Sequence, residues 1–359
     1  MARPMRWTFL HQTRLPPNGR DVAIIGAGPS GLAAAGYLAE TGYQVNVFDK
    51  LPKAGGLMVF GIPAHRIPAE RIAEAVDSLT KRYGVRFFLE TKICGESPLH
   101  SEAGDSFSCD LKSLSDIAAT HDAVIICTGT WRSRTMGIPG EDLPGVHTSL
   151  EFLFPIRAVG YASDLADVPD PTGKVVAVIG AGHSAIDVAH GALARNAAQV
   201  LVLYRRTRCE APCGTHEIEC LEQAGASWVE RVVPTRVLGS DRVRGLVLKS
   251  RGSSGDQSLE LPVDMVVTAI GEIPTVPFAR ELGLEHIAKG DVRWLQMTAK
   301  EGIFVAGDAL TGPSKIGKAF YSGLRAARSL HNWLNLKAMN RTVEYDGRED
   351  LIEPRELFS

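Results

Sequence analysis

The residues whose spacing points most directly to chemistry are three glycines. Gly26, Gly28 and Gly31 form a G-x-G-x-x-G pattern directly after the apolar run at residues 22–25. Where a strand turns into a helix, the first glycine permits the tight turn and the second lets a pyrophosphate approach the backbone. The third lets the helix pack closely on the strand. The pattern therefore predicts a dinucleotide-binding turn, with a glycine-rich turn that holds no ligand as the alternative.

An acidic residue follows at the distance that such a site requires. A second strand is expected at residues 44–48, and Asp49 follows it, roughly 20 residues after Gly26. A carboxylate at that position would hold the ribose hydroxyls of a dinucleotide. The glycine pair that ends at Gly56 suits a loop whose backbone lies close to a ligand, and a simple turn is the alternative interpretation.

A second glycine pattern lies in the middle of the chain. Gly180, Gly182 and Ala185 form G-x-G-x-x-A after the strand expected at residues 174–179, and His183-Ser184 lie inside the pattern. An apolar, alanine-rich stretch continues from it, as a helix would. We therefore expect a second dinucleotide site, built on a second parallel sheet.

The residues after the next strand bear on which nucleotide this second site prefers. Leu203 stands where Asp49 stands in the first copy, and Arg205-Arg206 follow it. An acidic group would accept a hydrogen bond from a free 2′-hydroxyl, whereas arginines favour a 2′-phosphate. NADP(H) is therefore favoured over NAD(H). The alternative is that both arginines are solvated charges at a strand end.

Two other apolar runs also end in residues that suit a ligand. One ends in Thr128-Gly129 and the other in Gly307-Asp308, at the carboxyl ends of predicted parallel strands, where ligands bind. Asp308 could hydrogen-bond a ribityl chain or a phosphate-linked sugar. The amphipathic helix expected at about residues 315–334 would direct its positive end at an electron-rich ligand atom.

The order of these motifs predicts the domain organisation. The chain of 359 residues is long enough for about two domains. We predict an α/β protein with two Rossmann-like domains, the first at 21–150 and 275–359 and the second inserted at 151–274. An N-terminal arm, residues 1–20, precedes them, and the polar stretch at 94–118 predicts a surface excursion.

Composition narrows the classes of partner and compartment. The chain is 45% hydrophobic and 22% charged, and its net charge of −2 gives no reason to expect a nucleic acid or an anionic membrane as partner. No apolar run reaches the roughly 18 residues that a membrane span needs. The N-terminus lacks the apolar region of a signal peptide, so the cytoplasm is the expected location.

The cysteines and polar side chains show no arrangement typical of a catalytic centre. Cys209, Cys213 and Cys220 have neither the C-x-x-C spacing of a redox pair nor a four-cysteine iron–sulfur spacing, so incidental small residues are favoured over a redox role. Neither a Ser/His/Asp set nor a metal-ligand pattern emerges. We predict no catalytic side chain and no metal site, since a redox cofactor would carry the reaction.

Together the motifs resemble the flavoprotein part of the glutamate synthase small subunit, within the pyridine nucleotide-disulfide oxidoreductase superfamily. The matching stretches are GAGPSGL (26–32), AGGLMVFGIP (54–63), IPGEDLPGV (138–146), VIGAGHSAIDVA (178–189), YRRTR (204–208), AIGEIP (269–274) and FVAGDALTG (304–312). The resemblance implies a glutathione-reductase-like fold in which the NAD(P) domain is inserted into the FAD domain. It also implies hydride transfer between nicotinamide and flavin N5.

The resemblance assigns the motif residues to the two cofactors. FAD contacts are expected from Gly26, Gly28, Pro29, Ser30, Gly31, Asp49, Lys50, Gly56, Leu57, Thr128, Gly129, Gly307 and Asp308. NAD(P) contacts are expected from Gly180, Gly182, His183, Ser184, Arg205, Arg206 and Gly271. His183 stands where these proteins commonly have asparagine, and Glu272 where they often have glutamine.

One departure from the family shapes the expected function. Glutamate synthase small subunits carry an N-terminal cysteine-rich iron–sulfur domain, whereas Cys94 is the first cysteine here. We therefore expect the electron-transfer subunit of a multi-subunit oxidoreductase, which exchanges electrons with an iron–sulfur protein or subunit. A stand-alone NAD(P)H:ferredoxin or NAD(P)H:acceptor reductase is one alternative. A non-catalytic scaffold that binds dinucleotides is another.

Overall fold

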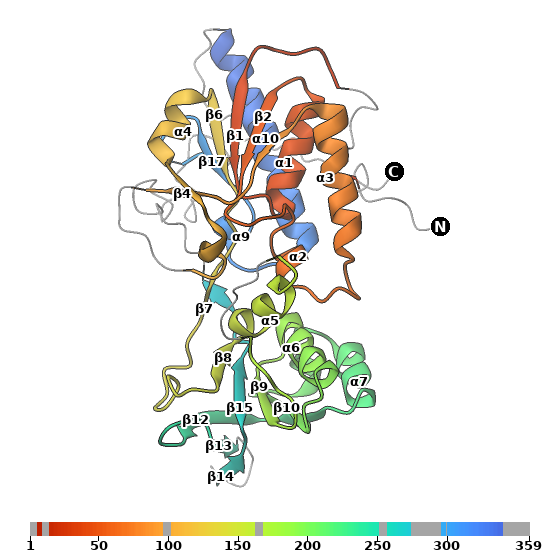
Figure 1. The fold of residues 1–359 in the computed structure, drawn as a ribbon, viewed down its shortest axis with the longest axis vertical. Helices are drawn as coiled ribbons and strands as arrows, with labels where there is room; N and C mark the ends of the chain where they lie inside the picture. The colour runs from red at the N-terminus through yellow and green to blue at the C-terminus, as the bar shows by residue number, and fades with distance from the viewer. Residues whose placement is uncertain are drawn as a thin grey trace. The chain divides into compact units, whose positions relative to one another are not determined.

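The protein consists of two compact units (Figure 1). The structure, a computed structural model, describes residues 6–8, 14–95, 102–161, 168–250, 257–273, 296–298 and 300–339. The first unit draws on Met1–Val59, Ile67–Trp131 and Pro274–Ser359, and the second on Phe60–Arg66 and Arg132–Ile273.

The first unit is built on a parallel five-stranded sheet. Its order is β17 (Ile303–Val305), β6 (Ala123–Ile126), β1 (Asp21–Ile25), β2 (Gln44–Phe48) and β3 (Arg86–Phe88). The central strands are apolar on both faces because helices or further strands cover both. On β1, Ile24 lies beneath α1, whereas Ala23 and Ile25 pack towards α4.

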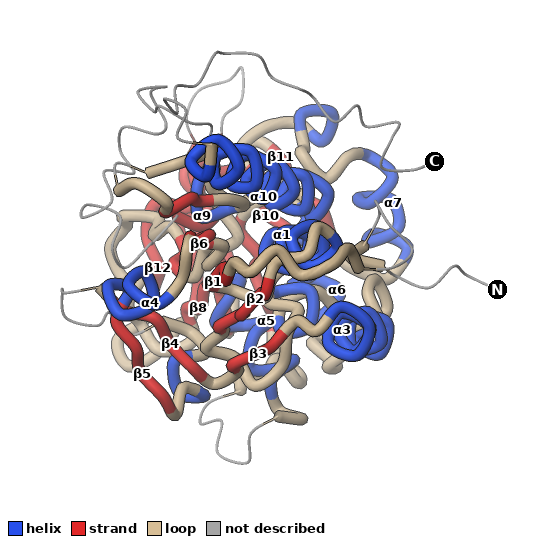
Figure 2. Tube along the Cα trace, turned by 90° about the horizontal axis from the view of Figure 1, so that it is seen from above, coloured by secondary structure: helices blue, strands red, loops and turns tan. Residues whose placement is uncertain are grey.

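Helices cover both faces of this sheet. The helices that begin in this unit are α1 (Pro29–Glu40), α2 (Leu57–Phe60), α3 (Ala69–Tyr83), α4 (Leu114–Thr120), α9 (Asp308–Thr311) and α10 (Ile316–Ala338). The last residue of α2, Phe60, belongs to the second unit. α1 packs beside both α10 and α3, and Figure 2 shows α1 and α10 together from above. α4 lies on the other face with the parallel pair β4 (Thr91–Cys94) and β5 (Asp110–Ser113). No helix in the described ranges combines the length and apolarity needed to cross a bilayer.

The second unit is also built on a parallel five-stranded sheet, but an antiparallel sheet packs on one of its faces. Its parallel sheet has the order β11 (Ser227–Glu230), β10 (Gln199–Tyr204), β9 (Val175–Ile179), β15 (Met265–Thr268) and β8 (Val146–Thr148). One face packs against α5 (Ser149–Ala158), α6 (His183–Ala194) and α7 (Thr215–Gln223). The other packs against an antiparallel sheet of β12 (Val232–Leu238), β13 (Gly245–Ser250) and β14 (Gln257–Pro262).

The units divide earlier in the chain than the expected boundary after residue 150. The division falls between Trp131 and Arg132. Strand pairing gives the reason, because β7 (Arg132–Ser133) pairs with β16 (Glu272–Ile273), and β8 is the edge strand of the second sheet. The other expected boundary, at residues 274–275, lies outside the described residues.

The described part of the N-terminal arm packs on the body of the first unit. Trp7 is 4% exposed, and its ring stacks on Phe320 at a centroid distance of 5.6 Å. Gly36 of α1 lies directly beneath, since a Cβ there would stand 1.6 Å from the Trp7 carbonyl oxygen. The sequence alone left open whether the aromatic residues of the arm pack on the body or on a partner, and Trp7 packs on the body.

The close approach of α1 and α10 generates a stability prediction. A Cβ on Gly323 of α10 would stand 2.0 Å from the Ser30 carbonyl oxygen of α1, whereas nothing described lies within 4 Å of a Cβ on Gly317. We expect Gly323→Ala to destabilise the protein by about 2 kcal/mol or more, because backbone atoms must separate. Gly317→Ala, the matched control on the same helix, should be neutral or stabilising by about 0.5–1 kcal/mol. Urea unfolding of both variants tests this, and equal stabilities would contradict it.

Candidate functional site

The first glycine turn joins β1 to α1 in the geometry that the spacing predicts. Gly26 has a φ of +105°, and a Cβ there would stand 2.3 Å from the Cys127 carbonyl oxygen. A Cβ on Gly31 would stand 1.9 Å from the Gly26 carbonyl oxygen. Gly28 differs, because the described chain leaves open space around its Cβ position at the N-cap of α1. Two glycines thus permit close packing, and the third leaves the helix start accessible to a phosphate.

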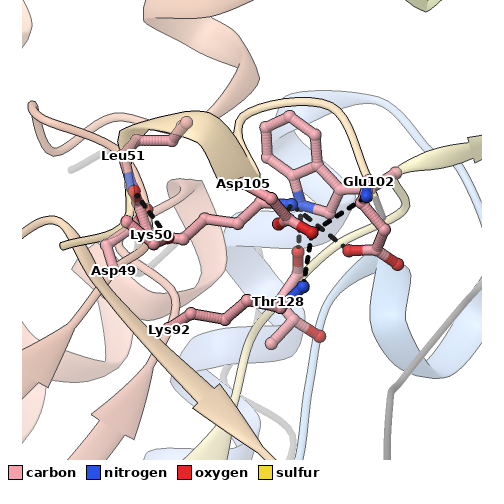
Figure 3. Close-up of polar contacts among 9 residues, drawn as sticks. Asp49, Lys50, Leu51, Lys92, Glu102, Asp105 and Thr128 are labelled. Atoms are coloured by element: carbon pink, nitrogen blue, oxygen red, sulfur yellow. Dashed lines mark hydrogen bonds and ion pairs between the residues drawn. The ribbon is translucent and has the colours of Figure 1, made fainter. Parts of the chain in front are cut away.

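Asp49 follows β2, and its carboxylate binds two backbone amides. Its Oδ2 accepts a hydrogen bond from the Ala27 amide of the first glycine turn at 2.5 Å. Its Oδ1 accepts one from the Leu51 amide at 2.9 Å (Figure 3). Burial raises the pKa of the Asp49 carboxyl, although these two amides and Lys50 act in the opposite direction. Each carboxylate oxygen has a further lone pair, so Asp49 can still accept from ribose hydroxyls.

Lys50, which the resemblance assigns to FAD, belongs to an ion-pair cluster (Figure 3). Its Nζ lies 3.2 Å from Glu102 Oε2 and 3.0 Å from Asp105 Oδ1, and 4.2 Å from the centroid of the Trp131 ring. Lys92 Nζ lies 2.5 Å from Asp105 Oδ2. Burial would raise the pKa of Asp105, but the two lysines and the Glu102 amide together outweigh burial and hold this pKa below its ordinary value.

Sequence reasoning missed this cluster. It treated residues 94–118 as a surface excursion, whereas Glu102 and Asp105 fold back to the residue that follows Asp49. Trp131 joins them because its Nε1 donates a hydrogen bond to the Thr128 carbonyl at 2.8 Å. In the sequence, the one sign of this cluster is Trp131, which lies two residues after the Thr128-Gly129 strand end.

The loop that ends in Gly56 lies on the first glycine turn. The Gly55 amide donates to the Ala27 carbonyl at 2.8 Å, and a Cβ on Gly56 would stand 3.0 Å from the Gly28 Cα. Leu57 follows as the half-buried first residue of α2. The loop therefore lies against the first glycine turn, and its closeness to a ligand stays a prediction.

Thr128 and Gly129 lie where β6 ends, beside the first turn. The Thr128 hydroxyl oxygen is buried and has no hydrogen-bond partner among the described residues. A buried polar group without a partner is costly, so this hydroxyl fits a bound ligand that supplies one. Gly129 has a φ of +72° and open space around its Cβ position within the described structure. These features fit a dinucleotide such as FAD in the first unit.

Gly307 and Asp308 complete this edge of the first sheet. A Cβ on Gly307 would stand 2.8 Å from the Ser30 Cβ, so Ser30 packs against this turn, and its hydroxyl donates to Cys127 Sγ at 3.5 Å. Asp308 Oδ1 accepts a hydrogen bond from the Ser314 hydroxyl at 2.6 Å, and burial raises the pKa of Asp308. Pro29 is the first residue of α1, a position that needs no amide donor.

The second glycine turn joins β9 to α6 in the second unit. Gly180 has a φ of +131°, and a Cβ there would stand 2.3 Å from the Ala269 carbonyl oxygen. Gly182 is the N-cap of α6, with no described atom within 4 Å of its Cβ position. His183 and Ser184 are the first two residues of the helix. This turn therefore repeats the division of roles seen in the first.

The two arginines follow β10 and are exposed. The Arg231 amide donates to the Arg206 carbonyl at 3.1 Å, which brings the end of β11 alongside Arg205-Arg206. Hydrogen bonds from Thr207 lower the pKa of the Glu210 carboxyl, and the charges of Arg206 and Arg231 lower it further. The side chain of Leu203, by contrast, is buried in the core.

Gly271 lies between β15 and β16, two residues after Ala269, the residue whose carbonyl lies against Gly180. Its φ is +103°, and its carbonyl accepts a hydrogen bond from the Arg134 amide at 2.9 Å. The neighbouring Glu272 accepts a hydrogen bond from the Ser149 hydroxyl at 3.4 Å.

An ion-pair cluster that the sequence did not reveal lies behind the second turn. Asp187 of α6 is buried, and its Oδ1 lies 2.8 Å from Nε of Arg66. Arg66 also binds Glu217 of α7. Burial, with the nearby Glu217 carboxylate, raises the pKa of Asp187 to about 6, although Arg66 acts to lower it.

The cysteines form no disulfide, since all six are free thiols. Cys213 is buried, Cys209 is exposed, and Cys220 Sγ lies 3.8 Å from His216 Nε2. This arrangement offers no support for a disulfide among Cys209, Cys213 and Cys220.

Comparisons with known proteins support the fold and the motif-based resemblance. The family model described as pyridine nucleotide-disulphide oxidoreductase matches residues 20–323. The beta subunit of the NADP(+)-dependent formate dehydrogenase of Moorella thermoacetica is 33% identical over 95% of this chain and 48% of its own length. The glutamate synthase [NADPH] small chain of Halomonas elongata is 31% identical over 88% of this chain and 68% of its own. The chain thus spans about half the length of the formate dehydrogenase subunit.

Solved structures confirm the two-domain α/β fold. Mycobacterium tuberculosis FprA in complex with NADPH aligns with a TM-score of 0.69 at 19% identity, over 92% of this chain and 87% of that one. Thioredoxin reductase of T. acidophilum aligns with a TM-score of 0.62 at 22% identity, over 87% of this chain and 98% of that one. The predicted fold class is therefore correct.

The raised pKa of Asp187 predicts how pH changes stability. The pKa of the Asp187 carboxyl is about 6 in the folded protein and lies above the ordinary value of 3.8. Between pH 3.8 and pH 6 this carboxyl is therefore protonated in the folded protein and ionised in the unfolded chain. The stability that this proton provides is present at low pH and is lost as pH rises through 6. We expect the wild type to lose about 1 kcal/mol between pH 5 and 7 relative to Asp187→Asn. Urea unfolding at both pH values tests this, and parallel pH dependence in both proteins would refute it.

Proposed function

The chain belongs to the pyridine nucleotide-disulphide oxidoreductase family, and on that premise we propose that it is an FAD-dependent NAD(P)H oxidoreductase that serves as an electron-transfer subunit. The observation that carries the proposal is the pair of glycine turns. Each has a second glycine, Gly28 or Gly182, with open space at the N-cap of a twelve-residue helix. Each turn thus offers a helix start to a pyrophosphate.

In the first unit we assign FAD to the edge formed by the ends of β1, β2, β6 and β17. Asp49 would bind the ribose of its adenosine half, and Gly28 would admit its pyrophosphate. The unpartnered Thr128 hydroxyl and the carboxyl of Asp308 are the polar groups available for the rest of the cofactor. Lys50 would contribute through the cluster that holds it over Trp131.

In the second unit we assign the nicotinamide nucleotide to the turn at Gly180 and Gly182. Arg205 and Arg206 follow the strand where an acidic ribose ligand would otherwise stand, and the buried Leu203 cannot replace one. Two exposed guanidinium groups suit a 2′-phosphate. We therefore propose NADPH rather than NADH as the preferred nucleotide.

Hydride exchange between a nicotinamide and flavin N5 is the chemistry that these cofactors supply when bound. This chain has to bind them, orient them and set the charge around them. We propose that the positive N-terminus of α10 favours negative charge on a bound flavin. A ligand-bound structure that places this helix start far from the flavin ring would refute that role.

The partner is the more specific part of the proposal. Two of the relatives are named as beta subunits, of an NADP(+)-dependent formate dehydrogenase and of an NADPH-Fe(3+) oxidoreductase. We propose that the partner of this chain is an iron–sulfur protein or subunit, which takes or supplies single electrons. The cytoplasm is the proposed compartment, in keeping with six free thiols.

The two alternatives differ from this proposal in measurable ways. A stand-alone reductase would reduce ferredoxin or another soluble acceptor without a bound partner, whereas a subunit would co-purify with cluster-bearing chains. A dinucleotide-binding scaffold would bind nucleotides, but NADPH would leave its flavin absorbance unchanged. Affinity purification from the native host, with iron analysis of the associated chains, separates the first two possibilities.

The cofactor assignment predicts how the flavin responds to each nucleotide. We expect anaerobic stopped-flow mixing of the FAD-loaded protein with NADPH to bleach flavin absorbance near roughly 450 nm faster than mixing with NADH. Replacing Arg205 and Arg206 together by alanine should raise the apparent dissociation constant for NADPH roughly 10- to 100-fold, since charge-assisted hydrogen bonds are lost. The constant for NADH should change little.

Arg236→Ala is the matched control, because Arg236 is an exposed arginine on β12 of the same unit. Equal or faster bleaching of the wild type by NADH would refute the nucleotide preference and leave the reaction intact. Absence of bleaching with either nucleotide would reject the oxidoreductase in favour of the scaffold.

A further inference from the structure

A short segment of the chain, Phe60–Arg66, belongs to the second unit although its neighbours on both sides belong to the first. We call it the crossing segment. It begins just after the loop whose Gly55 amide binds the Ala27 carbonyl at the first glycine turn. The chain thus passes within a few residues from one dinucleotide turn to the unit that holds the other.

Aromatic contacts hold the start of the crossing segment on the second unit. Phe60 is fully buried, and its ring lies 5.9 Å from that of Phe154 and 5.0 Å from that of Tyr161, measured between centroids. Near the other end, the His65 ring lies 6.2 Å from that of His190 on α6. The segment is therefore packed on the second unit at both ends.

The polar anchor of the crossing segment is Arg66. Its Nη1 and Nη2 donate to the two carboxylate oxygens of Glu217, at 3.2 and 2.7 Å. Its Nε lies 2.8 Å from Oδ1 of Asp187. One planar guanidinium therefore binds carboxylates on two helices, a geometry that a lysine cannot reproduce.

One of these two helices, α6, begins at the second glycine turn, and the loop before the other is bound to that turn. Asp187 lies one turn of α6 after His183, and Glu217 lies in the first turn of α7. The Cys213 amide, in the loop before α7, donates to the Ala181 carbonyl at 3.1 Å. Arg66 therefore bridges two helices that are both connected to Gly180–Gly182.

Removing Arg66 would leave two carboxylates facing each other. Asp187 is buried and Arg66 is the cation that lies against it, while Glu217 acts on Asp187 as a like charge. The hydrogen bonds from Arg66 keep the pKa of Glu217 below its ordinary value, so Glu217 is charged while Arg66 is present. Without the guanidinium, Asp187 would be a buried carboxyl with no cation against it and would take up a proton, and the bridge that joins α6 to α7 would be lost.

We propose that Arg66 is a positioning residue for the nicotinamide nucleotide, which it serves from the crossing segment by holding α6 and α7 around the second glycine turn. The proposal rests on the assignment of the nucleotide to that turn. Nucleotide affinity would then depend on a residue that follows, within the same stretch of chain, the loop that ends in Gly56. FAD binding in the first unit does not depend on Arg66.

The test compares Arg66→Ala, Arg66→Lys and Glu217→Ala with the wild type, all as full-length, FAD-loaded protein. The affinity for NADP⁺ is measured by flavin difference absorbance and by calorimetry, and the rate of flavin reduction at saturating NADPH separately. We expect Arg66→Ala to raise the dissociation constant about 10-fold or more, with unchanged FAD content and a reduction rate within about threefold of the wild type. Arg66→Lys should bind NADP⁺ more tightly than Arg66→Ala but less tightly than the wild type, because lysine keeps the positive charge but cannot bind both carboxylates as the planar guanidinium does.

A double variant tests whether Arg66 acts through Glu217. Arg66→Ala combined with Glu217→Ala should bind NADP⁺ no worse than Arg66→Ala alone, since both changes break one interaction. Arg71→Ala, an exposed arginine on α3, is the matched control and should bind as the wild type does. If Arg66→Ala does not fold, Arg66→Lys and Glu217→Ala carry the same comparison.

The outcomes distinguish this inference from the proposed function. A dissociation constant within twofold of the wild type in Arg66→Ala would overturn the inference, as would a loss of affinity that occurs only with loss of FAD. If NADPH fails to reduce the wild-type flavin at all, the proposed function fails instead, whatever the variants do.

Discussion

The constraint on which both sites depend is the steric one at the strand-to-helix turns. A Cβ on Gly26, or on Gly180, would stand 2.3 Å from a carbonyl oxygen at the end of the neighbouring strand. Any other residue would separate the turn from its sheet. Because the first glycine is held this tightly, the second is left with open space at the start of a helix. Sheet packing and ligand access are therefore consequences of one backbone geometry, used once in each unit.

Buried carboxylates are balanced differently in the two units. Asp49 is bound by two backbone amides and keeps acceptor capacity for a ligand, so its role is local to the first turn. Asp187 is balanced by the side chain of Arg66, which comes from a distant part of the chain. A backbone partner holds its position as long as the fold exists, whereas a side-chain partner can be removed by one substitution. The buried carboxylate near the second turn therefore depends on a side chain from a distant part of the chain, whereas the one at the first turn does not.

Several features followed from the sequence because they depend on local geometry. The glycine spacing, the apolar runs and the acidic strand end at Asp49 predicted the two turns, and β2 was predicted at its exact bounds. The resemblance to the glutamate synthase small subunit was correct at the level of family. Lys50 shows where such reasoning stops, because its partners Glu102 and Asp105 lie more than fifty residues away, in a stretch whose polarity predicted only a surface excursion.

The sequence by itself determined the fold class and the two glycine turns, because glycine steric freedom and strand apolarity act within a few residues. Only the tertiary structure decided that β8 joins the second sheet, that Trp7 packs on the body, and that Arg66 binds Asp187. Each of these depends on which distant segments meet. Polar and aromatic side chains carry no periodic pattern that reveals their partners, so their pairing follows from the packing of whole elements and cannot be read along the chain.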